Sequence, residues 1–192
     1  MQRVEALKVI IVNLMFKSNK MDLLILKPLS LCLVQMGEKG LELVKSYPDV
    51  LPRDIQNEII IKSMPLGAKD GDFTSTILSD NNAISGYVFS IPIQNSRDNI
   101  ASIVAVFDDT NYNTNNIRKL FSILVTELKK QNSFSTNILM EILPTLYRSF
   151  DTKNMKIKIS SIVTVEIDFS DDSSKENKPA NAAKSLTEDM WK

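Results

Sequence analysis

The chain has 192 residues, of which 43% are hydrophobic and 24% charged, so its length and composition fit one globular domain with flanking segments. Lysine plus arginine and aspartate plus glutamate both number 23, and this balance provides no overall positive field that would attract nucleic acid or an anionic membrane. The absence of histidine excludes Ser-His and Cys-His nucleophile pairs and removes the usual nitrogen ligand for zinc.

The first apolar run, Val9–Phe16, is far shorter than the roughly 20 residues that a membrane-spanning helix needs. Three interpretations of residues 1–22 stay open: an extra strand or helix packed on the domain, a basic amphipathic surface helix, or a leader upstream of a start at Met21. We treat this segment as a leader or accessory segment, and we expect the domain itself to begin near Leu23.

Two further apolar runs, Leu29–Met36 and Leu41–Ser46, are separated by four residues that begin and end with glycine, which predicts a β-hairpin. The only cysteine, Cys32, lies inside the first run, and we interpret it as a small buried hydrophobe. A single cysteine forms no intrachain disulfide, which favours a reducing, cytoplasmic compartment. Isoleucines at helical spacing predict a helix over Pro52–Ser63.

Three strands are predicted next, at Phe73–Leu78, Gly86–Ile93 and Ile100–Phe107, because apolar residues there alternate or run continuously between turn residues. The apolar period then changes from two residues to about 3.6, which predicts one helix with the stripe Ile117–Leu128 and another with the stripe Ile138–Phe150. From these elements we expect six side chains to be buried: Ile103, Val104, Phe121, Leu124, Ile142 and Leu143.

The segment Lys156–Phe169 alternates apolar and polar residues, which predicts a strand covered on one face only. Beyond it, residues 170–192 are rich in Asp, Ser, Lys, Asn and Ala, and we expect a flexible polar tail. The predicted domain therefore spans residues 23–169, with residues 156–169 as its last strand.

Two pairs of carboxylates are candidates for a divalent cation: Asp70 with Asp72, and Asp108 with Asp109. Both pairs lie at the ends of predicted elements, where aspartate commonly caps helices and closes turns. We therefore predict no metal site and no bound cofactor.

An enzyme without histidine would have to use aspartate, lysine or tyrosine, and Lys62, Lys69, Asp70 and Tyr87 lie near one another in the sequence. Single residues of these kinds are usually surface groups, so we predict no catalytic residues. The pair Lys129-Lys130 ends a predicted helix, where it complements the helix dipole without any ligand.

The predicted order is strand, strand, helix, three strands and two helices, and it resembles the longin fold over roughly Leu23–Asp151. The apolar first strand turning into Gly40–Val44, the Tyr47-Pro48 exit and the polar gap before Ile117 fit the same resemblance. It implies an α/β (α+β) fold with a five-stranded antiparallel sheet between one helix and two, to which this chain adds a C-terminal strand.

Longin-domain and related roadblock proteins are dimeric scaffolds and regulators in membrane trafficking, so the resemblance implies a function without catalysis. We expect a cytoplasmic interaction scaffold, at most peripherally associated with membranes, that forms a homodimer or pairs with a longin/roadblock-like domain. Its further partner would be a Ras-like small GTPase or a trafficking protein, and not a nucleic acid. The alternative is a small-molecule sensor of the profilin, PAS or GAF type, whose folds also place helices around an antiparallel sheet.

Overall fold

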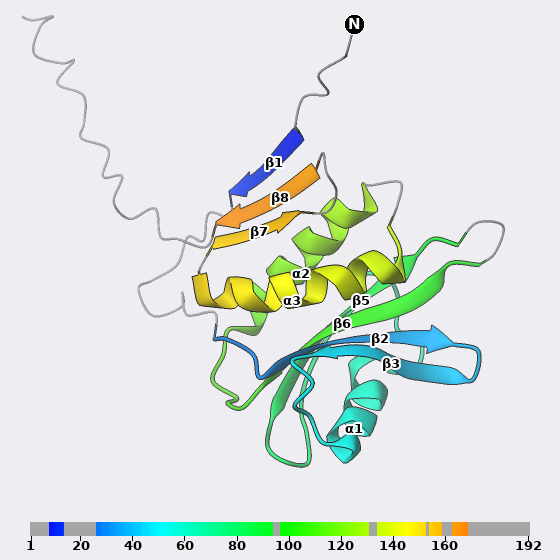
Figure 1. The fold of residues 1–192 in the computed structure, drawn as a ribbon. Helices are drawn as coiled ribbons and strands as arrows, with labels where there is room; N and C mark the ends of the chain where they lie inside the picture. Colours follow the sequence, from blue (N-terminus) through cyan, green and yellow to red (C-terminus); the bar gives the residue numbers. More distant parts are fainter. Residues whose placement is uncertain are drawn as a thin grey trace, which may run out of the picture.

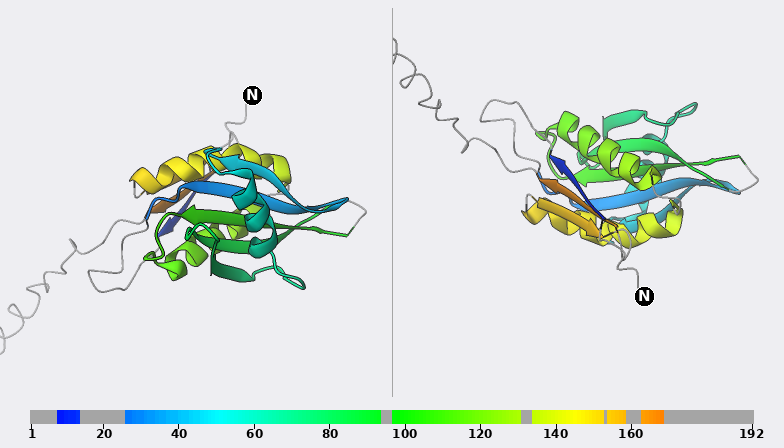
Figure 2. Two further views of the ribbon diagram at one scale, coloured as in Figure 1. Left: turned by 90° about the horizontal axis from the view of Figure 1, so that it is seen from below. Right: turned by 90° about the horizontal axis from the view of Figure 1, so that it is seen from above.

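The computed structural model describes residues 8–13, 26–93, 97–130, 134–152, 154–158 and 163–168. Five of the strands form an antiparallel sheet in the order β3-β2-β6-β5-β4, with helix α1 on one face and helices α2 and α3 on the other (Figures 1 and 2). The α+β class, the five-stranded antiparallel sheet and the placement of three helices on its two faces are thus as expected. The bounds are β2 (Ser30–Gly37), β3 (Gly40–Tyr47), α1 (Arg53–Ser63), β4 (Phe73–Ile77), β5 (Ala83–Ile91), β6 (Asn99–Phe107), α2 (Thr114–Lys129) and α3 (Thr136–Thr152).

The β2–β3 hairpin confirms the prediction made from its glycines. Gly37 and Gly40 are paired across the two strands, so that only two residues form the turn. Gly40 has a φ of 119°, which L-residues with a side chain rarely adopt. Its lack of a Cβ therefore permits the tight reversal.

The central strands are buried on both faces, because alternate residues of one strand enter different cores. In β2, Leu31 and Leu33 face α2 and α3, whereas Cys32 and Val34 face α1. This explains why the strand reads as a continuous apolar run instead of an alternating one. All six side chains predicted to be buried are at most 5% exposed: Ile103, Val104, Phe121, Leu124, Ile142 and Leu143.

Hydroxyl groups of the sheet satisfy the C-terminal end of α1. The carbonyl oxygen of Ser63 accepts hydrogen bonds from Thr74 Oγ1 at 3.3 Å and from Ser102 Oγ at 3.4 Å. The last carbonyls of a helix have no partner within the helix, so these two contacts stabilise the position where α1 ends. Gly86 lies beneath them, and a Cβ built there would be only 3.2 Å from the Ser63 oxygen. The absence of a side chain at Gly86 therefore lets α1 approach the sheet.

The predicted boundaries differ from the observed ones by a few residues, for local reasons. β5 begins at Ala83 instead of Gly86 and ends at Ile91, just before Pro92, which has no N–H to donate to a neighbouring strand. Helix α2 begins at Thr114, earlier than its apolar stripe, because the Asn113 side chain accepts a hydrogen bond from the backbone N–H of Asn116 at 3.1 Å.

A second sheet lies across α2 and α3 from the first (Figures 1 and 2). It contains β1 (Lys8–Asn13), β8 (Val163–Asp168) and β7 (Asn154–Lys158) in that order. β1 runs parallel to β8, and β7 runs antiparallel to it. Of the three interpretations of the N-terminal segment, the extra strand is the one that the backbone of Lys8–Asn13 adopts.

The expectation of one continuous strand over residues 156–169 is wrong. The segment instead contributes two strands, β7 and β8, that pair with each other and not with the five-stranded sheet. The same alternation of apolar and polar residues suits a hairpin and a single strand equally well, so periodicity does not distinguish them. The predicted domain start near Leu23 and the predicted tail, residues 170–192, lie outside the described residues.

Candidate functional site

The carboxylate pair Asp70 and Asp72 serves the fold. Both oxygens of Asp70 lie 2.7 Å from Lys129 Nζ, and one of them accepts the backbone N–H of Ser90 at 3.1 Å. The Asp72 carboxylate accepts the backbone N–H of Lys69 at 2.7 Å. Asp70 therefore links the end of α2 to the loop before β4, a role for Lys129 that goes beyond complementing the helix dipole.

The second carboxylate pair also lies in a turn. Asp109 Oδ1 accepts the backbone N–H of Asn111 at 2.8 Å, which is the local bond by which aspartate closes a loop. At the other end of α2, Lys130 Nζ pairs with Glu127 at 2.6 Å. Within the described ranges, no group of three or more aspartate, glutamate, cysteine or histidine side chains is arranged to hold a metal ion.

The four residues considered for catalysis do not converge on one site. Lys62 is on α1, where its Nζ donates to the carbonyl oxygen of Ile77 at 2.8 Å and pairs with Glu58 at 2.6 Å. Tyr87 faces the opposite side of the sheet, and its hydroxyl donates to Ser122 Oγ of α2 at 3.4 Å. The sheet therefore separates Lys62 from Tyr87.

Cys32 is completely buried on the α1 face of β2, as the sequence predicts. Burial disfavours the charged thiolate and raises the pKa of Cys32 to about 12. At neutral pH the group is a neutral thiol inside the core, so it is not a nucleophile in the folded protein.

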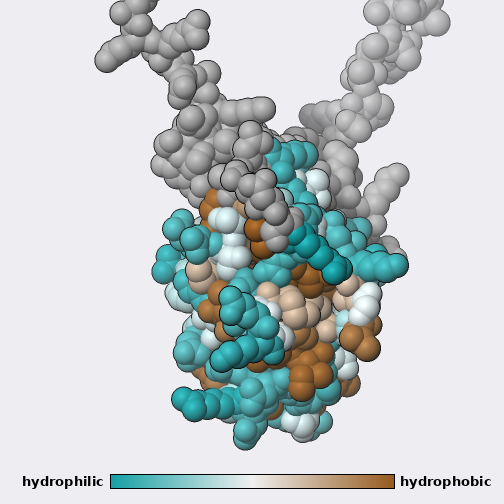
Figure 3. All heavy atoms as spheres, turned by 90° about the vertical axis from the view of Figure 1, so that its right-hand side faces the viewer, coloured by the Kyte–Doolittle hydropathy of each residue, from teal (hydrophilic) through white to brown (hydrophobic). Residues whose placement is uncertain are grey.

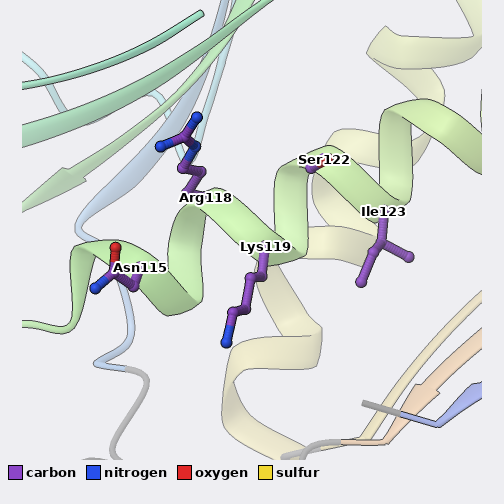
Figure 4. A pocket seen from close by; sticks show the side chains of 5 residues that line it. All are labelled: Asn115, Arg118, Lys119, Ser122 and Ile123. Atoms are coloured by element: carbon purple, nitrogen blue, oxygen red, sulfur yellow. The ribbon is translucent and has the colours of Figure 1, made fainter. Parts of the chain in front are cut away.

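A shallow hollow of about 470 Å³ lies on the outer face of α2 (Figure 4). Arg118 extends from this face toward β4, and its guanidinium carbon lies 5.9 Å from the centre of the Phe73 ring. No motif in the sequence indicated this hollow, because its residues follow the ordinary polar spacing of a solvated helix face. Its described lining residues all come from one helix: Asn115, Arg118, Lys119, Ser122 and Ile123.

The five-stranded sheet has two edge strands, β3 and β4, and helices contact both of them. The first edge strand, β3, lies between helices: Lys45 Nζ donates to the carbonyl oxygen of Met140 in α3 at 2.9 Å. The ring of Tyr47, at the end of β3, packs edge-on against Tyr147 of α3, with ring centres 5.5 Å apart. Helix α1 contacts β3 from the other face. β3 is therefore held between helices on its two faces, and α1 contacts β4 as well.

In the other edge strand, β4, every second residue directs its backbone N–H and C=O groups away from the sheet. Val88 N–H donates to the Asp72 carbonyl, and Leu78 N–H donates to the Asn82 carbonyl. Because hydrogen-bonded positions alternate in an antiparallel ladder, the even-numbered residues of β4 face β5. The backbone N–H and C=O groups of Phe73, Ser75 and Ile77 consequently point outward. Only β5 is paired with β4 among the described strands.

We call Phe73–Ile77 together with Lys62 the β4 edge. Lys62 covers one of its outward carbonyls, that of Ile77, and a lysine at a sheet edge is a common protection against uncontrolled strand pairing. The side chain of Ile77 is 52% exposed, which is unusual for isoleucine in a strand. The β4 edge thus combines exposed apolar surface with backbone groups that pair with no other described strand, and it is the best candidate for an interaction site.

Apolar side chains are exposed at several places on the described surface, Ile77 of the β4 edge among them. On the end of the molecule that carries the β2–β3 turn, hydrophobic residues form a continuous region among hydrophilic ones (Figure 3). Exposed apolar surface of this kind is typical of proteins that bind other proteins. The large exposed apolar side chains are Met36, Val50, Ile61, Leu66, Ile77 and Ile93.

None of the helices in the described part of the chain is both long and apolar enough to cross a membrane. No protein-family model and no curated protein sequence matches the chain.

Proposed function

We propose that this chain is a non-enzymatic interaction scaffold of longin-like architecture, which pairs with a second domain and binds a Ras-like small GTPase or another membrane-trafficking protein. The arrangement of helices supports the proposal, because one helix covers one face of the five-stranded sheet and two helices cover the other. This is the arrangement that the resemblance noted in the sequence leads one to expect.

The single observation that carries the proposal is the β4 edge, whose outward backbone groups pair with no other described strand. A sheet edge of this kind either needs protection or takes up a partner, and among the described side chains only Lys62 caps one of its carbonyls.

The test is affinity purification with the full chain as bait, in a lysate of the native organism supplied with either GDP or a non-hydrolysable GTP analogue. We expect mass spectrometry to identify a small GTPase or trafficking protein in one nucleotide state. Two variants sharpen the test: Ile77→Lys places a charge on the β4 edge, and Val50→Lys makes the same change at a side chain that is 62% exposed near the opposite edge.

The identified protein is then purified, and its affinity for the wild-type chain is measured by calorimetry in both nucleotide states. A partner that binds the wild type and Val50→Lys equally, but Ile77→Lys at least tenfold more weakly, would support the proposal. Capture of no GTPase or trafficking protein, together with a small molecule that raises the Tm of the purified chain, would favour the sensor alternative instead.

A further inference from the structure

Three loops lie at one end of the five-stranded sheet. The turn after β2 and the segment after β5 are neighbours there, because β2 pairs with β6 as far as Gln35 and Ala101, and β5 pairs with β6 as far as Ile91 (Figure 1). The loop between α1 and β4 reaches the same end, since its Gly71 N–H donates to the Val88 carbonyl of β5 at 2.9 Å. We call the described residues of these loops the loop end: residues 36–40, 64–72, 92–93 and 97–98.

The loop between α1 and β4 presents a leucine at its apex. The Ala68 N–H donates to the Pro65 carbonyl at 3.0 Å, which closes a four-residue turn. Gly67 has a φ of 82°, and a positive φ at the third position is what a type II turn requires. Leu66 is the second residue of this turn and is completely exposed.

The other two loops of the loop end also expose a large apolar side chain. Met36, near the end of β2, is 44% exposed, and Ile93, just after β5, is 45% exposed. Figure 3 shows a continuous hydrophobic region on this end of the molecule. Large apolar side chains gain free energy when they leave water, so three of them at one end favour a ligand or a surface that covers them.

A basic residue follows the exposed apolar residue in each loop, three or four positions later. Lys39, Lys69 and Arg97 are all exposed, and their side chains form no hydrogen bond or ion pair with another described residue. Glu38 and Asp98 are exposed directly beside Lys39 and Arg97, so the charge of the loop end is nearly balanced. The loop end therefore presents apolar tips with single cations beside them, and no strongly positive surface.

This combination suits the interface of a phospholipid bilayer. Lysine and arginine keep their charged ends at the level of the lipid phosphates, while apolar side chains beside them enter the boundary below to a depth of about 5–10 Å. A bilayer accepts three separate tips because its lipids move apart around them, whereas a folded protein would need a complementary hollow for each. The balanced charge makes zwitterionic phosphatidylcholine sufficient, with no requirement for anionic lipid.

We propose that the loop end is a membrane-contact surface, through which the chain binds phospholipid bilayers weakly and reversibly by inserting Met36, Leu66 and Ile93. The β4 edge stays accessible in this arrangement. Its exposed Ile77 pairs with Ala83, the first residue of β5, and therefore lies at the opposite end of the sheet from the loop end. A protein at the Ile77 end of the β4 edge and a bilayer at the loop end can consequently be bound at the same time.

The first test is sedimentation of the purified full chain with phosphatidylcholine vesicles. A single myristoyl chain binds bilayers with a constant of about 10⁴ M⁻¹, and three partly exposed side chains bury less apolar surface, so we expect half of the chain to be bound at lipid concentrations on the order of 1–10 mM. Leu66→Ser should weaken binding about tenfold or more. The matched control is Val50→Ser, which changes an exposed apolar residue beyond the other end of β3 and should leave binding unchanged.

The second test locates the contact on the chain. Leu66→Trp and Val50→Trp are each made together with Trp191→Phe, so that the introduced tryptophan is the only one present. Phosphatidylcholine with bromine on its acyl chains quenches a tryptophan that enters the bilayer. We expect at least threefold stronger quenching for Leu66→Trp than for Val50→Trp. Circular dichroism of each variant shows that it is folded.

Three results would overturn the proposal: no sedimentation of the wild type at about 10 mM lipid, equal sedimentation of the wild type and Leu66→Ser, or equal quenching of the two tryptophan variants. Binding that requires anionic phosphatidylserine and disappears at about 1 M salt would also overturn it, because charge would then drive the contact. Neither measurement includes a GTPase, so the membrane-contact surface and the proposed partner class fail separately.

Discussion

The close contact between α1 and the sheet predicts that Gly86→Ala destabilises the fold. A Cβ at this position would lie 2.9 Å from Thr74 Oγ1, 3.2 Å from Ser102 Oγ and 3.2 Å from the Ser63 carbonyl oxygen. The Ser63 oxygen belongs to the backbone, so α1 or β5 must move to make room. Overpacking of a tight core costs about 1–3 kcal/mol.

Part of this cost is offset, because alanine restricts the unfolded chain more than glycine and thereby stabilises the fold by about 0.4–1 kcal/mol. We expect a net loss of up to about 2.6 kcal/mol in the free energy of unfolding. For a domain of this size, each kcal/mol lowers the Tm by about 2–4 °C. Urea and thermal unfolding followed by circular dichroism measure both quantities.

Gly37→Ala is the matched control, since it makes the same substitution in another strand of the same sheet. Its Cβ would lie 2.7 Å from Glu42, but the contact is with the carboxylate end of a flexible, exposed side chain that can turn away. Both variants gain the same restriction of the unfolded chain, so their difference, about 1–3 kcal/mol, isolates the packing cost at Gly86. If the two variants unfold within about 0.5 kcal/mol of each other, α1 does not pack on Gly86 as described.

Three further predictions concern titration, reactivity and the second sheet. The hydrogen bond from Lys62 and those from the Ser79 backbone and hydroxyl lower the pKa of Glu58 from 4.5 to about 2. Glu58 therefore contributes stability above pH 4.5 that is lost as the pH falls toward 2. In Glu58→Gln, the free energy of unfolding measured in urea should depend less on pH between 4.5 and 2. Because burial raises its pKa to about 12, the Cys32 thiol should react with a thiol reagent at pH 8 only after unfolding in urea; rapid reaction in the native protein would contradict its burial. Truncation after Asp151 removes β7 and β8 and leaves β1 without its neighbour, so we expect this variant to have a lower Tm or to aggregate. Truncation after residue 170 should leave the Tm unchanged. If the two truncated chains have equal Tm values, the second sheet is an accessory to the fold.

Local order along the chain was predictable from the residues because it depends on short-range physics. Each of the following patterns predicts one element from neighbouring residues alone. They are the glycines at both ends of the β2–β3 turn, the apolar stripes beginning at Ile117 and Ile138, and the isoleucines of α1. Burial was predictable for the same reason. Phe121 and Leu143 lie on the apolar stripes of their helices, and such side chains are removed from water when the helix packs on the sheet.

The break between β7 and β8 marks the limit of that reasoning. Ser160-Ser161 lie between the two halves of the segment, but the apolar residues keep the same period on both sides of them. The segments that form β7 and β8 would show the same periodicity in one continuous strand and in a hairpin. Which of the two forms depends on the neighbouring strand that is available. β1 supplies that neighbour, and it comes from the other end of the chain.

The candidate site was decided by tertiary structure alone. Lys129 and Asp70 are 59 residues apart, and Lys62 and Ile77 are 15 apart, so neither contact has a signature at any fixed spacing. The contacts at the two edge strands are likewise not predictable from β3 or β4 themselves. Helices contact both strands, α1 and α3 at β3 and α1 at β4, and Lys62 is the only described side chain that caps an outward carbonyl of β4. Sequence patterns report what each residue prefers locally, and an edge becomes an interaction site only through what the rest of the fold leaves uncovered.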